Sequence, residues 1–170
     1  MRKVFRRFGF AILAGVLWTL PAMHLARADF MVTSVDNDFV AEIKSAAEAG
    51  KNLVIMFHQT GCPYCDKMRD RVFPDPRVNA SYSKSFVMIE SNILGDLPVV
   101  SPQGEKTTEK VYARKMRVRA TPMFVFFDKE GKDVLTVTGF LDAERFIKAG
   151  KYVTDGVYKQ GKSFYRYLQE

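Results

Sequence analysis

The sequence predicts an α/β fold in which a central mixed sheet of about four strands is flanked by helices. Three mainly apolar runs have the length and the β-branched or aromatic content of buried strands: Leu53–Phe57, Phe86–Glu90 and Met123–Phe127. Helical patterns separate these runs, which favours strands joined by crossover helices. A fourth run, Val134–Thr138, follows the third across the polar turn Lys129–Lys132 and predicts an antiparallel hairpin.

Five stretches show helical periodicity or helix-boundary residues. They cover Asp36–Ala49, Cys62–Phe73, Arg77–Ser85, Thr107–Lys115 and Asp142–Val153. Gly50 is expected to end the first, and Pro74 and Pro76 the second, because proline cannot continue a helix. Asp142 is expected to cap the last helix. The segment Asn92–Gln103, which contains glycine and prolines, is predicted to be a loop.

The strongest functional signal is the motif Cys62-Pro63-Tyr64-Cys65, which holds both cysteines of the chain. It follows a predicted strand and opens a predicted helix. A helix N-terminus carries partial positive charge and unpaired N–H groups, which lower the pKa of a thiol placed there. The pattern therefore predicts a redox-active dithiol. Cys62 is expected to be the exposed attacking thiolate, and Cys65 the shielded residue that resolves the mixed disulfide.

Two other interpretations of the motif stay open. Structural zinc takes four ligands, and His58 with two cysteines does not complete that set, while His24 lies in a segment expected to be removed; a three-ligand catalytic zinc is the remaining form. A purely structural disulfide across two residues closes a very short loop and stabilises the fold little. We expect redox chemistry with no bound metal and no cofactor.

Residues 1–28 have the three parts of a secretory signal peptide. Four basic residues and no acid lie in the first eight, an uncharged and mainly apolar run follows over Gly9–Leu20, and Ala26–Ala28 offers the small residues of a cleavage site. The apolar run is shorter than the ~20 residues that span a bilayer. We expect cleavage after Ala28 and a periplasmic protein without stable membrane insertion, with an uncleaved anchor as the alternative. Residues 29–170 are then one domain, with a C-terminal tail from about residue 154.

The charge of the chain gives no case for nucleic-acid binding. The full sequence has 26 basic and 19 acidic residues, but residues 1–28 contain five of the basic residues and none of the acidic ones. Residues 29–170 therefore carry 21 basic and 19 acidic residues. The apparent basicity belongs to the targeting segment, and no nucleic-acid partner is expected.

Over roughly residues 52–152 the chain resembles the thioredoxin superfamily. The resemblance rests on the strand and Cys-x-x-Cys helix at Val54–Cys65, on Ala120-Thr121-Pro122 before a strand, and on Gly139 before the last helix. The stretch Cys62–Ile89 is similar to exported thioredoxin-like proteins: the SoxW type of sulfur-oxidation clusters and the C-terminal domain of the membrane thiol reductase DsbD. The resemblance implies that Pro122 is cis and lies beside the dithiol.

The resemblance also implies the function and the residues that contact substrate. Such proteins reduce disulfides of other exported proteins and receive electrons from a membrane thiol reductase. Pro63, Tyr64, Thr121 and Pro122 are then expected to line the substrate surface around Cys62 and Cys65. The rivals are a disulfide-donating oxidase or isomerase of the same fold, a glutathione-binding protein, and a non-catalytic module that binds thiol or copper clients.

The sequence departs from the thioredoxin pattern near the dithiol. Met56 stands where thioredoxins usually carry a buried aspartate that accepts a proton from the second cysteine, and Gly61 stands in place of the tryptophan before the first. Glu90 and water are the candidate proton acceptors. His58 is a candidate cation beside Cys62, or else a strand-end side chain pointing elsewhere. Arg69, with its basic neighbours on the same helix, is expected to be solvated.

Overall fold

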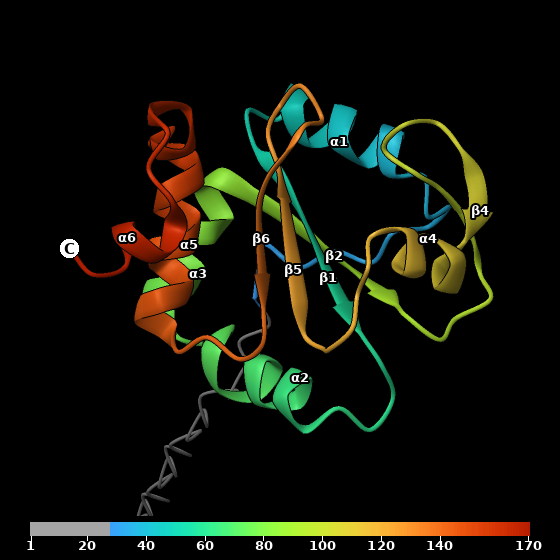
Figure 1. Cartoon of the computed structure of the whole chain (residues 1–170), viewed down its shortest axis with the longest axis horizontal. Coiled ribbons are helices and arrows are strands. Elements are labelled where there is room, and N and C mark those ends of the chain that lie inside the picture. The colour runs from blue at the N-terminus through green and yellow to red at the C-terminus, as the bar shows by residue number, and fades with distance from the viewer. Residues whose placement is uncertain (1–27) are drawn as a thin grey trace, which may run out of the picture.

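The computed structural model describes residues 28–170, whose central feature is a four-stranded sheet in the order β2-β1-β5-β6 (Figure 1). The strands are β1 (Asn52–His58), β2 (Phe86–Asn92), β5 (Met123–Phe127) and β6 (Asp133–Thr138). β1 pairs in parallel with β2 and antiparallel with β5, and β5 pairs antiparallel with β6. The predicted mixed sheet and its hairpin are confirmed. The predicted signal peptide lies, apart from Ala28, outside the described residues.

Helices cover both faces of the sheet (Figure 1). They are α1 (Phe39–Glu48), α2 (Pro63–Lys67), η1 (Met68–Val72), α3 (Pro76–Ser85), α4 (Glu109–Lys115), α5 (Ala143–Thr154), η2 (Val157–Gln160) and α6 (Phe164–Tyr167). Successive strand residues face opposite sides, so β1 contributes Val54 and Met56 to a core under α2, η1, α3 and α5. Its residues Leu53, Ile55 and Phe57 enter a second core under α1 and α4.

The first and last predicted helices show how a capping residue sets the boundary. The side chain of Asp38 accepts a hydrogen bond from the backbone N–H of Ala41 at 3.0 Å, so α1 begins at Phe39 and not at the predicted Asp36. Asp142 caps α5 in the same way, through the N–H of Arg145 at 2.8 Å, as predicted.

The predicted helix over residues 62–73 is wrong in one respect, because it changes type midway. After α2 the chain forms a π-helix, η1, in which the N–H of Phe73 donates to the carbonyl of Met68 at 2.9 Å. The wider turn lets Met68, Val72 and Phe73 all be buried in the core that the sheet shares with α3 and α5.

The predicted loop Asn92–Gln103 and the start of the helix after it need correction. Residues Pro98–Val100 form strand β3, which pairs antiparallel with β4 (Lys106–Thr108), so α4 begins two residues later than expected. Val99 is buried in the core shared with α1, and Asp38 forms an isolated bridge with Val100. The burial of one valine thus anchors a segment whose glycine and prolines suggested a loop.

Both ends of the described chain pack onto the domain. Phe30 is 1% exposed, and the segment around it bonds to Met88 of β2 along that strand's outer edge, with N···O distances of 2.7 and 2.9 Å. The residues beyond 154, predicted only as a tail, form η2 and α6. Phe164 is buried against Tyr152 of α5, whose hydroxyl donates to the carbonyl of Lys162 at 2.7 Å. No helix among residues 28–170 combines the length and apolar composition that a membrane span requires.

Candidate active site

The Cys-x-x-Cys motif lies at the turn from β1 into α2. Cys62 is the N-cap of α2 and has an extended backbone, while Pro63 takes the first helical position, where its missing N–H leaves no bond unmade. The sulfur of Cys62 accepts a hydrogen bond from the backbone N–H of Cys65 at 3.2 Å. The same N–H also donates to the backbone carbonyl of Cys62 at 3.0 Å, so the sulfur shares this donor with the first turn of α2.

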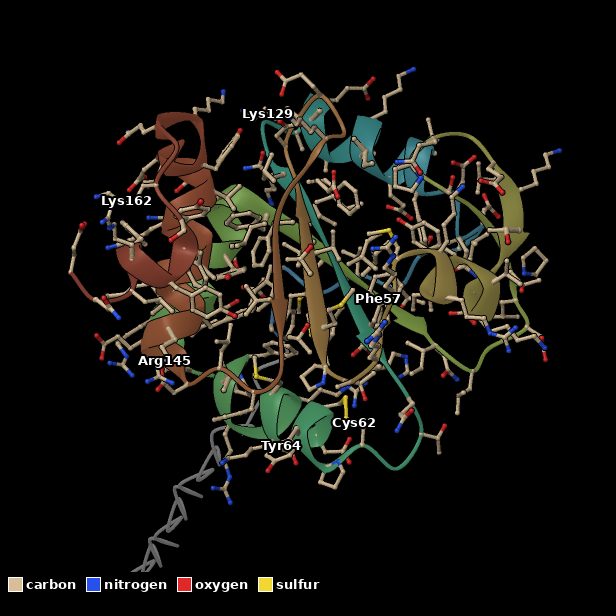
Figure 2. The ribbon with its side chains drawn as sticks, viewed as in Figure 1. Phe57, Cys62, Tyr64, Lys129, Arg145 and Lys162 are labelled. Atoms are coloured by element: carbon tan, nitrogen blue, oxygen red, sulfur yellow. A yellow bond between two sulfur atoms is a disulfide. The ribbon has the colours of Figure 1, made fainter. Side chains whose placement is uncertain are left out.

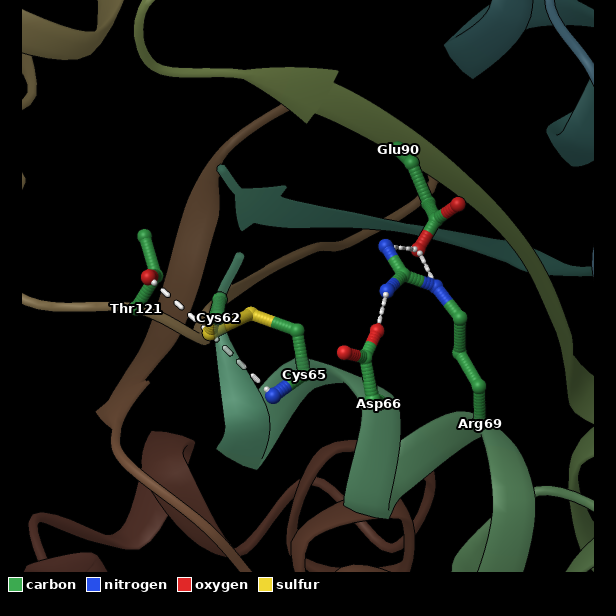
Figure 3. Close-up of a disulfide and its surroundings, with 6 residues drawn as sticks. All are labelled: Cys62, Cys65, Asp66, Arg69, Glu90 and Thr121. Carbon is green, nitrogen blue, oxygen red and sulfur yellow. Dashed lines mark hydrogen bonds and ion pairs between the residues drawn. A yellow bond between two sulfur atoms is a disulfide. The ribbon is translucent and has the colours of Figure 1, made fainter. Parts of the chain in front are cut away.

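The two cysteines form a disulfide whose Cα atoms are 5.3 Å apart (Figure 3). Cys65 is fully buried and Cys62 is 4% exposed. The expectation of a shielded Cys65 is therefore confirmed, but that of an exposed Cys62 is wrong for this oxidised form. The Cys62 sulfur is bonded to Cys65 on one side and approached by Thr121 on another, which leaves little of it open to solvent.

Thr121 and Pro122 lie beside the disulfide, although they are about sixty residues away in the sequence. The hydroxyl of Thr121 donates to the Cys62 sulfur at 3.2 Å (Figure 3). The Thr121–Pro122 peptide bond is cis, as the resemblance implies. The carbonyl of Pro122 accepts a hydrogen bond from the N–H of Gly139 at 2.8 Å. This bond ties the β5 entry loop to the loop after β6.

Tyr64 is the exposed member of the motif, with 58% of its surface accessible, and lies next to Cys62 at the start of α2 (Figure 2). Its ring centroid is 6.5 Å from that of Phe140, and the Nζ of Lys67 lies 4.2 Å from the Phe140 centroid. Phe140 was not among the site residues predicted from the sequence. Its only signal was its place directly after Gly139, which the resemblance had already marked.

Arg69 is not the solvated side chain that sequence analysis expected. Its guanidinium contacts Oε1 of Glu90 on β2 through Nε at 2.9 Å and Nη2 at 2.8 Å, and Oδ1 of Asp66 on α2 through Nη1 at 2.9 Å (Figure 3). Glu90, a candidate proton acceptor, is therefore engaged by a cation. It stands opposite Met56 in the β1–β2 register.

His58 ends β1 and lines a cleft of about 600 Å³, together with Glu90, Asn92 and Glu109. Burial lowers the pKa of His58 below its usual 6.5, an effect that the neighbouring Glu90 opposes. The imidazole is therefore neutral at pH 7, which argues against His58 as a cation beside Cys62. Glu109 is almost fully buried and accepts a hydrogen bond from the N–H of Asn92 at 2.8 Å.

The predicted site residues thus divide into two groups. The structure brings Thr121 and Pro122 to the Cys62–Cys65 pair, and it places Pro63 and Tyr64 on the exposed side of the helix start. Within residues 28–170, no cluster of three or more histidine, cysteine, aspartate or glutamate side chains has an arrangement that would hold a metal ion.

Comparison with known proteins relates this chain to thiol:disulfide exchange proteins. It is 30% identical over 98 residues to the thiol:disulfide interchange protein DsbD of Photorhabdus laumondii, a match that covers 56% of this chain and only 15% of that protein. A thioredoxin from Thermus thermophilus is 28% identical with a TM-score of 0.54, covering 72% of this chain and 88% of the other.

A thioredoxin-fold protein from Helicobacter pylori, 19% identical, supports the fold alone, with a TM-score of 0.58 and 83% of each chain covered. The family model for thioredoxin-like domains matches residues 39–154, which include all the residues that surround the disulfide. With its thioredoxin fold and its Cys-x-x-Cys pair, this chain belongs to the thioredoxin-like domain family.

Proposed function

We propose that this chain is a periplasmic thiol–disulfide oxidoreductase that mainly reduces disulfides of exported client proteins. The observation that carries the proposal is the pair of donors on one sulfur. The Cys65 N–H and the Thr121 hydroxyl both point at Cys62 Sγ. In the reduced protein this position is taken by a thiol or thiolate sulfur, and two donors stabilise the charged form.

The exchange reaction follows from the order of the two cysteines. The Cys62 thiolate attacks one sulfur of a client disulfide; the client S–S bond breaks, a mixed disulfide forms, and the released client thiolate takes a proton from water. Cys65, buried behind Cys62, then loses its proton to water and attacks the Cys62 sulfur. The mixed disulfide breaks and the second client thiolate leaves and is protonated. Two electrons have passed to the client, and the Cys62–Cys65 disulfide remains.

Client access is supported by the surface around Cys62. Thr121 lies just before the strand β5, and we expect its backbone to pair with an extended client segment, as in strand addition. Tyr64 is exposed on the other side of the motif. Cys62 is 4% exposed in the oxidised form, and we expect a client to approach its sulfur from the side of these two residues.

The compartment and the electron donor are further parts of the proposal. The signal-peptide pattern of residues 1–28 supports export. An oxidising compartment does not return the Cys62–Cys65 disulfide to the dithiol, so a reductase there needs a membrane electron donor. The sequence similarity to the DsbD of Photorhabdus laumondii supports a relation to thiol:disulfide interchange, although the match spans only 15% of that protein.

Trapping and potential measurements together test the proposal. Cys65→Ser is expected to accumulate mixed disulfides with clients, and Cys62→Ser to trap none and to lose insulin reduction. The Cys62–Cys65 potential is expected to lie at roughly −270 to −200 mV. A potential near about −120 mV would instead indicate a disulfide donor. No insulin reduction and no trapped client would leave only a binding role.

A further inference from the structure

We propose that Arg69 is a positioning residue that affects how readily Cys62 forms a thiolate. Arg69 binds the carboxylates of Asp66 and Glu90, and these three residues form a charge cluster beside the helix that carries Cys65. The proposal rests on the proposed function, because it concerns the redox poise of the same cysteine pair. None of the three residues takes part in the exchange reaction, and their net charge is expected to change the pKa of Cys62.

The contacts of Arg69 join α2, which carries Cys65, to β2, the strand that pairs with β1. Asp66 directly follows Cys65 on α2, and Glu90 lies on the neighbouring strand β2. One guanidinium bonds to both carboxylates, at 2.8 to 2.9 Å (Figure 3). Arg69 itself belongs to the π-helix η1, one turn beyond Cys65. Such a planar, multi-donor arrangement orders both carboxylates more firmly than a single lysine contact would.

The cluster faces the same side of the sheet as the cysteines. Glu90 pairs in register with Met56, and Met56 belongs to the buried cluster that contains Cys62 and Cys65. The side chains of Glu90 and Arg69 are 28% and 30% exposed, whereas that of Asp66 is 62% exposed. The charges of Glu90 and Arg69 are therefore screened less by solvent than that of Asp66.

The three side chains of the cluster together carry one net negative charge. Asp66 and Glu90 contribute two negative charges and Arg69 one positive charge. His58 and Glu109 line the adjacent cleft together with Glu90, and the variants tested below leave both of them in place. The Nζ of Lys67, on the same helix, is over the ring of Phe140 and not part of the cluster. A negative excess disfavours the thiolate, so Arg69 keeps that penalty small.

This charge balance predicts opposite effects for the two partners. Arg69→Gln leaves two negative charges and should raise the pKa of Cys62, so its alkylation at about pH 6 slows about threefold, the effect of half a pKa unit. Glu90→Gln leaves no net charge and should speed alkylation about threefold. The double variant returns to one negative charge and should lie near the wild type.

The experiment is the alkylation rate of Cys62 in the fully reduced full-length protein, read by peptide mass, in these variants and two controls. Arg69→Lys keeps the charge and should restore most of the rate. Arg71→Gln removes an exposed charge from the same π-helix and should leave the rate unchanged. The reduction potential of each variant should follow the same order, because a more stable thiolate makes the disulfide easier to reduce.

If Arg69 only held α2 against β2 and its charge had no effect on Cys62, the variants would give a different pattern of alkylation rates. If Arg69→Gln and Glu90→Gln shift the rate in the same direction, or if neither shifts it beyond the Arg71→Gln control, the proposal is overturned. Because alkylation needs no client, this outcome is separate from insulin reduction. A wild-type protein that fails to reduce insulin would overturn the proposed function, while opposite shifts in the variants would still support the role of Arg69.

Discussion

The hydrogen bond from Thr121 to Cys62 makes the sharpest prediction for the cysteine itself. Thr121→Val keeps the shape and the β-branch but removes the hydroxyl that lies 3.2 Å from Cys62 Sγ. In the reduced protein that sulfur is the thiolate, so the lost bond is one to a charged acceptor. Such bonds contribute about 1.5–3 kcal/mol. The low end applies here, because sulfur is a weak acceptor and the Cys65 N–H remains as a second donor.

A loss of about 1.4 kcal/mol corresponds to one pKa unit. We therefore expect Thr121→Val to raise the pKa of Cys62 by about one unit and to cut the thiolate fraction about tenfold below that pKa. The assay is the pH dependence of thiolate absorbance or of alkylation rate in reduced protein. Thr121→Ser is the matched control, because it keeps a hydroxyl donor. If the valine and serine variants titrate within about 0.3 unit of each other, the hydroxyl has no role in stabilising the thiolate.

Three further predictions concern stability and its pH dependence. Burial lowers the pKa of His58, so between that lowered pKa and about 6.5 the unfolded chain binds a proton at His58 and the folded chain does not. The free energy of unfolding should therefore fall as pH drops from about 6.5 towards the folded-state pKa. His58→Gln should make this fall less steep in urea titrations at several pH values, and an unchanged slope would contradict the prediction. Phe30→Ala should cost about 3–5 kcal/mol of unfolding free energy, because the ring is buried against Phe73 and Tyr82, whereas Val35→Ala, at a side chain 90% exposed, should cost almost nothing. Gly95→Ala should destabilise the fold by about 1–3 kcal/mol, because its Cβ would lie 1.9 Å from Glu109 Oε2, and a neutral result would show that the buried carboxylate moves freely.

The elements that sequence analysis predicted well are those whose signal is local. Three apolar strands, the N-cap at Asp142 and the Cys-x-x-Cys turn are each specified within a few neighbouring residues. The β3–β4 pair was missed because it depends on the burial of Val99 against a helix from another part of the chain. The π-helix was missed because its single inserted residue leaves the apolar spacing of residues 62–73 compatible with an ordinary α-helix.

The electrostatics of the site were the least predictable part, for a physical reason. Glu90 and Arg69 are 21 residues apart, and their contact depends on which face of β2 Glu90 takes and on how η1 is wound. A one-residue change of strand register would turn Glu90 to the opposite face of the sheet. The sequence showed an acid at the end of a strand and a base on a helix, but only the fold shows that they are partners.

Two separate sets of groups around Cys62 can change the pKa of its thiol. The backbone N–H of Cys65 and the hydroxyl of Thr121 contact the sulfur directly, and their positions follow from the helix cap and the β5 entry loop. Asp66, Arg69 and Glu90 pair with one another, and in our proposal they affect the Cys62 pKa through their charge. Replacing a side chain in that charge cluster changes the cost of the thiolate without moving the backbone that a client contacts. The two sets should therefore contribute additively to the pKa of Cys62, and a double variant of Thr121 and Glu90 that departed from additivity would show that the cluster also moves the cap.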